Sequence, residues 1–349
     1  MGRAGQAAIM TDLLHSSHMN KSTAADSTHI GKLANVPFRP LFIIGDHRSG
    51  TTLLHRLMAE TGCFNYVSAY HVMRYGEILA NHFEGREEEA KRKLAESFLA
   101  LGLKDRIIDN VPVTPELPVE YGFILSAAAN VRRPRITAET RSTFTELCRK
   151  VQLVSDPARP LLLKNPWDVL NFAEIKAQLP DSRFVFIHRH PVAVLTSQLR
   201  AIRSLLSARN DFAAMLAPWY AQLFDQPWRL SAARFLDAPP FRLWERLLGV
   251  HVVRVAEYYL RNIRSLPMAD YVSIKYEELC QEPDGTMERI LKFAGVEPAR
   301  TRSYADQIEP RPPKVMEDVR RLYRRISGRI QPYLNLHGYE DEPAWMRGR

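Results

Sequence analysis

The stretch from Leu41 to Leu54 reads LFIIGDHRSGTTLL, and it determines the fold class that we expect for the chain. Its apolar start is typical of a buried strand, and the loop that follows is bounded by Gly45 and Gly50. Glycines at such positions let the backbone approach a phosphate, and the N–H groups at the start of the next helix offer an anion site. The stretch therefore predicts a phosphate-binding loop between a strand and a helix.

This loop differs from a nucleoside triphosphate loop at one position. In the pattern G-x-x-x-x-G-K-[ST] a lysine follows the second glycine and reaches the β- and γ-phosphates. Here Thr51 takes the place of the lysine, Thr52 supplies the hydroxyl, and the cation lies inside the loop as Arg48. The loop thus argues against ATP or GTP hydrolysis and favours a donor with a shorter phosphate arm.

Four apolar or β-branched runs indicate strands, and each is followed by helix-like sequence: residues 41–44, 161–164, 183–189 and 271–276. This alternation predicts an α/β fold with a P-loop-like central parallel sheet flanked by helices. Ligands of such sheets collect beyond the carboxyl ends of the strands. Arg48, Lys164 and Arg189 all stand at such ends, so we expect three cations to converge on one crevice.

The chain organisation predicted from the sequence is a tail followed by one domain. Residues 1–36 are small, polar and aperiodic, which favours a flexible tail, and residues 37–349 would form the domain. A charge-rich helix is expected at about 84–101 and a helical insertion at about 199–267. The insertion contains three tryptophans at helical spacing, usually a sign of core packing, but it is also where an acceptor pocket or lid would be built: Trp219, Trp228 and Trp244.

Composition limits the class of protein without selecting one. Lys and Arg number 48 against 39 Asp and Glu, a net charge of +9 that suits anionic small molecules, nucleic acid or anionic lipid alike. No nucleic-acid motif is present, and Arg320 to Arg329 (RRLYRRISGR) is interpreted as a basic helix face. No apolar run approaches the ~20 residues of a membrane span, and three distant cysteines argue against a disulfide framework or a zinc site. We expect a soluble, uncleaved, cytoplasmic protein; nothing indicates its oligomeric state.

A second segment, from Arg183 to Ser197, reads RFVFIHRHPVAVLTS, with Arg189 in an Arg-x-Pro sequence and Ser197 eight residues later. Together with GDHRSGTTLL it resembles the sulfotransferases that use 3'-phosphoadenosine 5'-phosphosulfate (PAPS). The YEEL sequence at Tyr276 is a weaker likeness. The resemblance spans about residues 37–339 and is nearest to the broad branch that includes tyrosylprotein and many bacterial small-molecule sulfotransferases; the Arg-Lys-Gly loop of the cytosolic aryl branch has no counterpart here.

The resemblance implies a role for each element. Arg48 and the loop would bind the 5'-phosphate and its leaving oxygen, the other loop residues being Ser49, Gly50, Thr51 and Thr52. Arg189 and Ser197 would hold the 3'-phosphate through charge-assisted hydrogen bonds. Lys164, in LLLKNPWD, is similar to a lysine at the start of a K-x-P turn in related enzymes and would stabilise the sulfuryl or bridging oxygens. A surface lysine is the alternative.

Sulfuryl transfer also needs a group that takes the proton of the acceptor, and three candidates stay open. Glu120, in TPELPVEYGF, lies in a segment similar to a Pro- and Glu-containing stretch of the family. His71, in SAYHVMRYGE, lies about where relatives place an acidic base, and its ordinary pKa of about 6.5 suits base chemistry. Glu77 is the third. The two histidines that flank the Arg-x-Pro arginine, His188 and His190, are expected to pack rather than react.

The leading hypothesis is a PAPS-dependent sulfotransferase that acts on a hydroxyl of a small-molecule, carbohydrate or lipid acceptor, with PAPS as co-substrate and without a required metal. Two alternatives remain. A kinase or nucleoside triphosphatase with a degenerate P-loop would want a magnesium-binding acidic strand end, where this chain has basic residues. A non-catalytic nucleotide-bisphosphate-binding protein would have kept the donor site and lost the proton acceptor.

Overall fold

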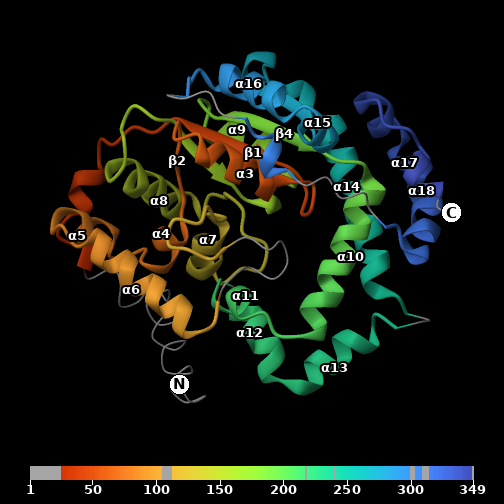
Figure 1. Ribbon diagram of the computed structural model, residues 1–349, viewed down its shortest axis with the longest axis horizontal. Helices are drawn as coiled ribbons and strands as arrows, with labels where there is room; N and C mark the ends of the chain where they lie inside the picture. Colours follow the sequence, from red (N-terminus) through yellow and green to blue (C-terminus); the bar gives the residue numbers. More distant parts are fainter. Residues whose placement is uncertain are drawn as a thin grey trace. The chain divides into compact units, whose positions relative to one another are not determined.

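The computed structural model describes residues 25–103, 112–216, 218–238, 241–298, 303–308 and 314–347, and it contains one five-stranded sheet flanked by helices (Figure 1). The strand order is β2-β3-β1-β4-β5, and the pairings β2–β3, β1–β4 and β4–β5 are parallel. The strands are β1 (Pro40–Ile44), β2 (Asn65–Tyr66), β3 (Leu161–Lys164), β4 (Arg183–His188) and β5 (Tyr271–Lys275). The predicted α/β class is confirmed. Only β2 was not expected, because two residues carry no periodicity.

Helices make up most of the described chain. The α-helices are α3 (Thr51–Glu60), α4 (Ala69–Met73), α5 (Ile78–Phe83), α6 (Glu87–Ala100), α7 (Gly122–Ala129), α8 (Arg141–Leu153), α9 (Phe172–Gln178), α10 (Pro191–Ser207), α11 (Asp211–Leu216), α12 (Pro218–Asp225), α13 (Pro227–Phe235), α14 (Leu243–Asn262), α15 (Tyr276–Gln281), α16 (Pro283–Ala294), α17 (Glu317–His337) and α18 (Ala344–Arg347). Short 3₁₀ helices are η1 (Ile30–Leu33), η2 (Pro166–Leu170), η3 (Ile263–Ser265), η4 (Met268–Asp270) and η5 (Ala305–Gln307).

The chain divides into two compact units, each built from separate stretches of sequence. Unit 1 comprises Met1–Pro40, Phe64–Asn165 and Arg209–Asp225, and unit 2 comprises Leu41–Cys63, Pro166–Ala208 and Gln226–Arg349.

Unit 1 is organised around α8, which contacts η1, α5, α7 and β2. Asp26 is fully buried in this unit. One of its carboxylate oxygens lies 2.9 Å from Lys150 Nζ, and the other accepts a hydrogen bond of 2.9 Å from the backbone N–H of Ala80. The described part of the expected tail, residues 25–36, therefore contributes a buried side chain to unit 1, because Asp26 supplies the partner that a buried lysine requires.

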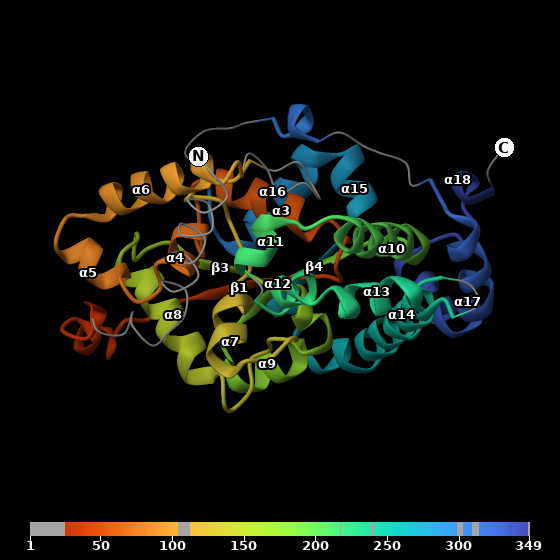
Figure 2. The same cartoon turned by 90° about the horizontal axis from the view of Figure 1, so that it is seen from below.

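Unit 2 contains β1, β4 and β5 with helices on both sides of these strands. Figure 2 shows α3 and α16 on one side of β4, and α9 and α14 on the other. The Phe186 ring of β4 lies 5.0 Å from Phe172 of α9 and 5.4 Å from Tyr259 of α14, measured between ring centroids. Both faces of β4 are thus covered, which explains why its sequence is a continuous apolar run without alternation.

The insertion after the Arg-x-Pro element is helical, as predicted, and spans the end of α10 to α14. Its tryptophans do not form a core. Trp219 and Trp228 are 42% and 67% exposed, whereas Trp244 is half-buried and donates its Nε1–H to Ala233 O at 3.2 Å. Core packing is therefore wrong for Trp219 and Trp228. Helical spacing predicts that residues share one face of a helix, but not that another element covers this face. The helix α13, which carries Trp228, has no buried residue.

Three further observations bear on the expected protein class. Cys63 and Cys148 are buried and Cys280 is half-buried, and all three are free thiols. No helix in the described ranges has the length and apolar character needed to cross a membrane. Within the same ranges, no three His, Cys, Asp or Glu side chains are grouped so that they could hold a metal ion.

Candidate active site

The loop between β1 and α3 has the backbone of an anion site. Gly50 and Arg48 have φ angles of +102° and +71°, in the left-handed region, and α3 begins directly after Gly50 with no capping side chain. A Cβ on Gly50 would lie 2.3 Å from Cδ2 of Tyr276, so only glycine fits there. No side chain caps α3 at Gly50, and a helix start of this kind after a glycine-bounded loop is a common anion site.

Unit 2 brings the predicted donor-binding residues together. Arg48 Nε donates to Ser197 Oγ at 3.0 Å, and Arg189 donates from Nη1 to the Arg48 carbonyl oxygen, also at 3.0 Å. The Arg-Ser-Gly-Thr-Thr loop, the end of β4 and the first two turns of α10 thus meet at one place. Two cations from distant parts of the sequence share this site with the start of α3, and an anion with more than one phosphate is the ligand class that such an arrangement suits.

Tyr276 supports both parts of this site. Its ring packs against Gly50, and the Arg189 guanidinium carbon lies 4.1 Å from the ring centroid. Arg189 Nε is buried without a hydrogen-bond partner among the described residues. In the sequence, YEEL was only a weaker family likeness; in the structure its tyrosine ring lies against the Arg-x-Pro arginine.

The histidines on either side of Arg189 have packing roles, as expected. His188 shares a hydrogen bond of 2.8 Å with Tyr333 Oη, and burial together with the nearby His337 holds its pKa well below the ordinary value. His190 caps α10 by accepting from the Val192 N–H at 3.3 Å, and burial lowers its pKa as well. Both imidazoles are therefore neutral and structural.

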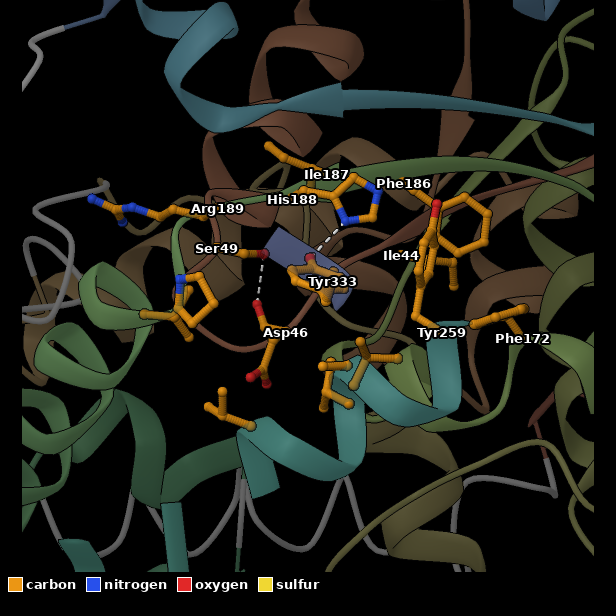
Figure 3. Close-up of a pocket in the computed structure, with 17 residues that line it drawn as sticks. Ile44, Asp46, Ser49, Phe172, Phe186, Ile187, His188, Arg189, Tyr259 and Tyr333 are labelled. Atoms are coloured by element: carbon orange, nitrogen blue, oxygen red, sulfur yellow. Dashed lines mark hydrogen bonds between the residues drawn. The ribbon is translucent and has the colours of Figure 1, made fainter. Parts of the chain in front are cut away.

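A small cavity lies beneath the loop, between β4 and α14 (Figure 3). Its volume is about 50 Å³, enough for water and far below that of a nucleotide. His188 and Tyr333 border it, whereas the Arg189 side chain extends away from it (Figure 3). The cavity is also lined by Gly45, Asp46 and Ser49 of the loop, and by itself it is too small to hold a nucleotide.

The loop is also held by residues that the sequence analysis did not single out. His251 of α14 places Nε2 at 2.9 Å from Asp46 Oδ1, and Gln198 of α10 donates to His47 O at 2.8 Å. Ser49 Oγ donates to the Asp46 carbonyl oxygen at 2.7 Å. Asp46 stands inside the quoted loop motif, but nothing in the sequence near His251 indicates its partner.

Unit 1 brings Lys164 and Glu120 together. Lys164 Nζ lies 2.6 Å from Glu120 Oε1, and the two side chains are 1% and 12% exposed. The surface-lysine alternative is therefore excluded. Gly122 allows this approach, since a Cβ there would be 2.6 Å from Oδ1 of Asn165, the residue after Lys164. The strand end and the turn before α7 thus form one packed cluster around a buried ion pair.

His71 lies in unit 1 as a helix cap. Its Nδ1 accepts from the Ser68 N–H at 3.1 Å, while Ser68 Oγ accepts from the His71 N–H at 3.3 Å, which completes a capping box at the start of α4. Burial lowers the pKa of His71 to about 4. The third candidate, Glu77, lies 3.8 Å from Arg74 in a half-exposed ion pair. These placements favour Glu120 among the three.

The backbones that carry Glu120 and His71 run side by side. The Ala69 N–H donates to Leu117 O at 2.9 Å, and the Val119 N–H donates to Val67 O at 3.0 Å.

Basic residues of α17 are paired along and beside their helix, for example Arg321 with Asp318 at 3.0 Å and Arg329 with Glu257 at 2.6 Å. That segment is a basic helix face, as interpreted from the sequence.

Comparison with known proteins places this site in a family. Residues 40–300 match the model of the sulfotransferase family. Among solved structures, sulfotransferase STF9 from Mycobacterium avium superposes with a TM-score of 0.55 at 15% identity, covering 99% of this chain and 80% of that chain. Sulfotransferase STF1 from Mycobacterium tuberculosis H37Rv gives a TM-score of 0.53 at 14% identity, covering 96% and 84%. No curated protein gives a significant match.

At these identities the two structures establish only the fold. The family model establishes the family, because it covers well over half of the sequence and includes both the loop and the Arg-x-Pro segment. The chain belongs to the sulfotransferase family.

Proposed function

We propose that this protein transfers a sulfuryl group from PAPS to a hydroxyl of a small-molecule, carbohydrate or lipid acceptor. The observation that carries the proposal is the meeting of Arg48, Ser197 and Arg189 at the start of α3. Two separate anionic groups on one donor would account for two arginines that approach the loop from different elements.

The residues present fit such a donor. Arg48 and the backbone of Ser49, Gly50, Thr51 and Thr52 would bind the 5'-phosphate, because the uncapped start of α3 favours an anion there. Arg189 and Ser197 would hold the 3'-phosphate, and the buried Nε of Arg189 has donor capacity to spare. The missing P-loop lysine fits a donor without a γ-phosphate.

The ion pair of unit 1 supplies the remaining chemistry. PAPS provides the sulfuryl group and a phosphate leaving group; the acceptor oxygen forms the new bond to sulfur as the bond from sulfur to the bridging oxygen breaks. The Glu120 carboxylate would take the proton of the acceptor hydroxyl, and the Lys164 ammonium would stabilise charge on the transferring oxygens. His71 is the weaker candidate for the base, because one ring nitrogen is used in the helix cap.

No metal ion has a step in this scheme. The cations Arg48, Lys164 and Arg189 would neutralise the charge that magnesium neutralises in nucleoside triphosphate chemistry. The three free cysteines favour a reducing compartment, and we propose the cytoplasm.

Ligand-dependent thermal unfolding tests the donor assignment. Adenosine 3',5'-bisphosphate should raise the melting temperature, with about 2.7 kcal/mol of stabilisation at 100 times Kd, and Mg·ATP should do so much less. Equal or stronger protection by Mg·ATP would remove the proposal. A panel of alcohols, sugars and lipids incubated with PAPS and screened by mass spectrometry for addition of SO₃ would then identify the acceptor; transfer to none of them would favour a non-catalytic binding protein.

A further inference from the structure

The loop contains a charge of the wrong sign for an anion site. Asp46 follows Gly45 directly, and its side chain is only 8% exposed. A buried carboxylate this close to a phosphate-binding backbone would oppose a phosphate unless a neighbouring group compensated its charge. The partners of Asp46 therefore bear on how the loop binds its ligand.

Asp46 is turned towards α14, and its Oδ1 contacts both α14 and the loop backbone. Its Oδ1 accepts from the backbone N–H of His47 at 2.7 Å and lies 2.9 Å from His251 Nε2. Figure 3 shows its carboxylate pointing towards the teal helix, which is α14, with Ser49 on its other side. Burial alone would raise the pKa of Asp46, but His251 and His47 lower it overall, so the carboxylate is charged at neutral pH.

His251 contacts the loop from α14, through its bond to Asp46. Its side chain is 25% exposed, while its neighbours Val252 and Val253 are buried in the packing of α14 against α10 and α17. The His251–Asp46 bond thus joins the donor loop to the longest helix of the insertion. Gln198, bonded to the His47 carbonyl, joins the same loop to α10.

We infer that His251 is a positioning residue: its bond to Asp46 holds the loop in its anion-binding shape and couples donor binding to the order of α14. The inference rests on the proposed function for the identity of the donor. The coupling follows from thermodynamic linkage. A donor that binds only one shape of the loop stabilises the state in which α14 packs on the loop, and packing of α14 on the loop raises the affinity for the donor by the same factor.

The test uses His251→Ala, the conservative His251→Gln, whose amide N–H reaches a similar position, and Arg254→Ala as a matched control. Arg254 is exposed on the same helix.

Calorimetry with adenosine 3',5'-bisphosphate should show binding about tenfold weaker in His251→Ala, as expected for a hydrogen bond to a charged group. His251→Gln should recover most of this loss, and Arg254→Ala should bind as the wild type. If an acceptor is known, the loss should appear in KM for PAPS and leave kcat at saturating donor within about twofold, because a positioning residue of the ground-state site does not touch the reacting atoms.

Hydrogen exchange separates coupling from a general loss of stability. In the wild type, adenosine 3',5'-bisphosphate should protect both the loop and residues 243–262; in His251→Ala it should protect the loop alone. A double mutant, Asp46→Ala with His251→Ala, should bind no worse than Asp46→Ala if the two residues act through each other. Unchanged donor affinity and unchanged protection of α14 in His251→Ala would overturn the inference.

The inference can fail separately from the proposed function. Failure of wild-type protein to bind adenosine 3',5'-bisphosphate would refute the donor assignment. Hydrogen exchange without ligand would still test whether His251 holds the loop. The amides of residues 45–50 should exchange faster in His251→Ala than in the wild type and in Arg254→Ala. Equal exchange in all three proteins would mean that His251 does not hold the loop.

Discussion

Lys164 Nζ lies 2.6 Å from Glu120 Oε1 at the carboxyl end of β3, and the lysine is 1% exposed. A buried ammonium and carboxylate in direct contact form a pair in which each group compensates the charge of the other. In the proposed reaction the two charges have different tasks: the lysine acts on the transferring group, and the glutamate acts on the proton of the acceptor.

Lys164→Met should lower turnover about 10²–10³-fold, because it removes an oxyanion-type contact made in the transition state. Adenosine 3',5'-bisphosphate, which lacks the sulfuryl group, should bind nearly as well as to the wild type. Loss of one partner of a buried ion pair also costs about 3–5 kcal/mol of stability, so turnover must be measured well below the melting temperature of the variant.

Lys150→Met is the matched control for this experiment. Lys150 and Asp26 form a second buried ion pair of unit 1, at 2.9 Å and with both side chains 1% exposed. Both variants should lose comparable stability, measured by urea unfolding, but only Lys164→Met should lose turnover in the folded state. Near-normal turnover in folded Lys164→Met would show that the lysine is structural.

Arg189→Ala should weaken the binding of adenosine 3',5'-bisphosphate by about 1.5–3 kcal/mol, because a charged hydrogen-bond donor is removed. Adenosine 5'-monophosphate, which lacks the 3'-phosphate, should lose much less. Arg183→Ala is the control: Arg183 stands at the other end of β4, with its guanidinium carbon 4.0 Å from the Phe293 ring centroid. The same loss for both nucleotides in calorimetry would mean that Arg189 does not read the 3'-phosphate.

Gly50→Ala should damage the loop in two ways. The φ of +102° costs an L-residue about 1–2 kcal/mol, and the new Cβ would be 2.3 Å from the Tyr276 ring. We expect at least a tenfold loss of donor affinity in calorimetry. Gly285→Ala, in α16 with open space around the added Cβ, should leave donor affinity unchanged. Wild-type affinity in Gly50→Ala would show that the loop shape does not control binding.

The meeting of the loop with Arg189 and Ser197 could be anticipated because its sequence signals are local. The loop is continuous in sequence between a buried run and a helix start, and Arg189 follows an apolar run that is typical of a parallel strand. Four strands and the α/β class followed from the same pattern. Gly50 belongs to the loop motif, and the structure explains why a glycine is needed there: a Cβ would clash with the Tyr276 ring.

Partners distant in sequence were not predictable in the same way. Glu120 and Lys164 are 44 residues apart, and Asp46 and His251 are 205 apart. Periodicity predicts the helix or strand face on which a residue lies, but not which residues of other elements it contacts. For the same reason the helical spacing of Trp219 and Trp228 left core packing and an acceptor pocket or lid both open, and the two side chains are exposed. Asp26 was assigned to a tail because its segment is polar, although burial of Lys150 required a carboxylate.

His71→Gln distinguishes a helix cap from a general base. Glutamine at this position of a capping box retains the cap of α4, but it cannot accept a proton near neutral pH. If Glu120 is the base, His71→Gln should keep turnover within about threefold of the wild type, whereas Glu120→Gln should lose at least about 10². A large loss of turnover in folded His71→Gln, with donor affinity intact, would make His71 the base.

The same variant carries a stability signature whose sign is fixed by the pKa of His71, which burial lowers from 6.5 to about 4. Between these values the unfolded chain binds a proton at His71 and the folded chain does not, so the free energy of unfolding falls as the pH drops from about 6.5 to about 4. His71→Gln removes this contribution. Its urea-unfolding free energy should therefore decline less than that of the wild type between pH 7 and pH 4.5, while the contributions of His188, His190 and His337 remain in both proteins. Identical pH dependence of the two proteins would mean that the His71 imidazole is not buried in its neutral form, and the lowered pKa would no longer count against His71 as the base.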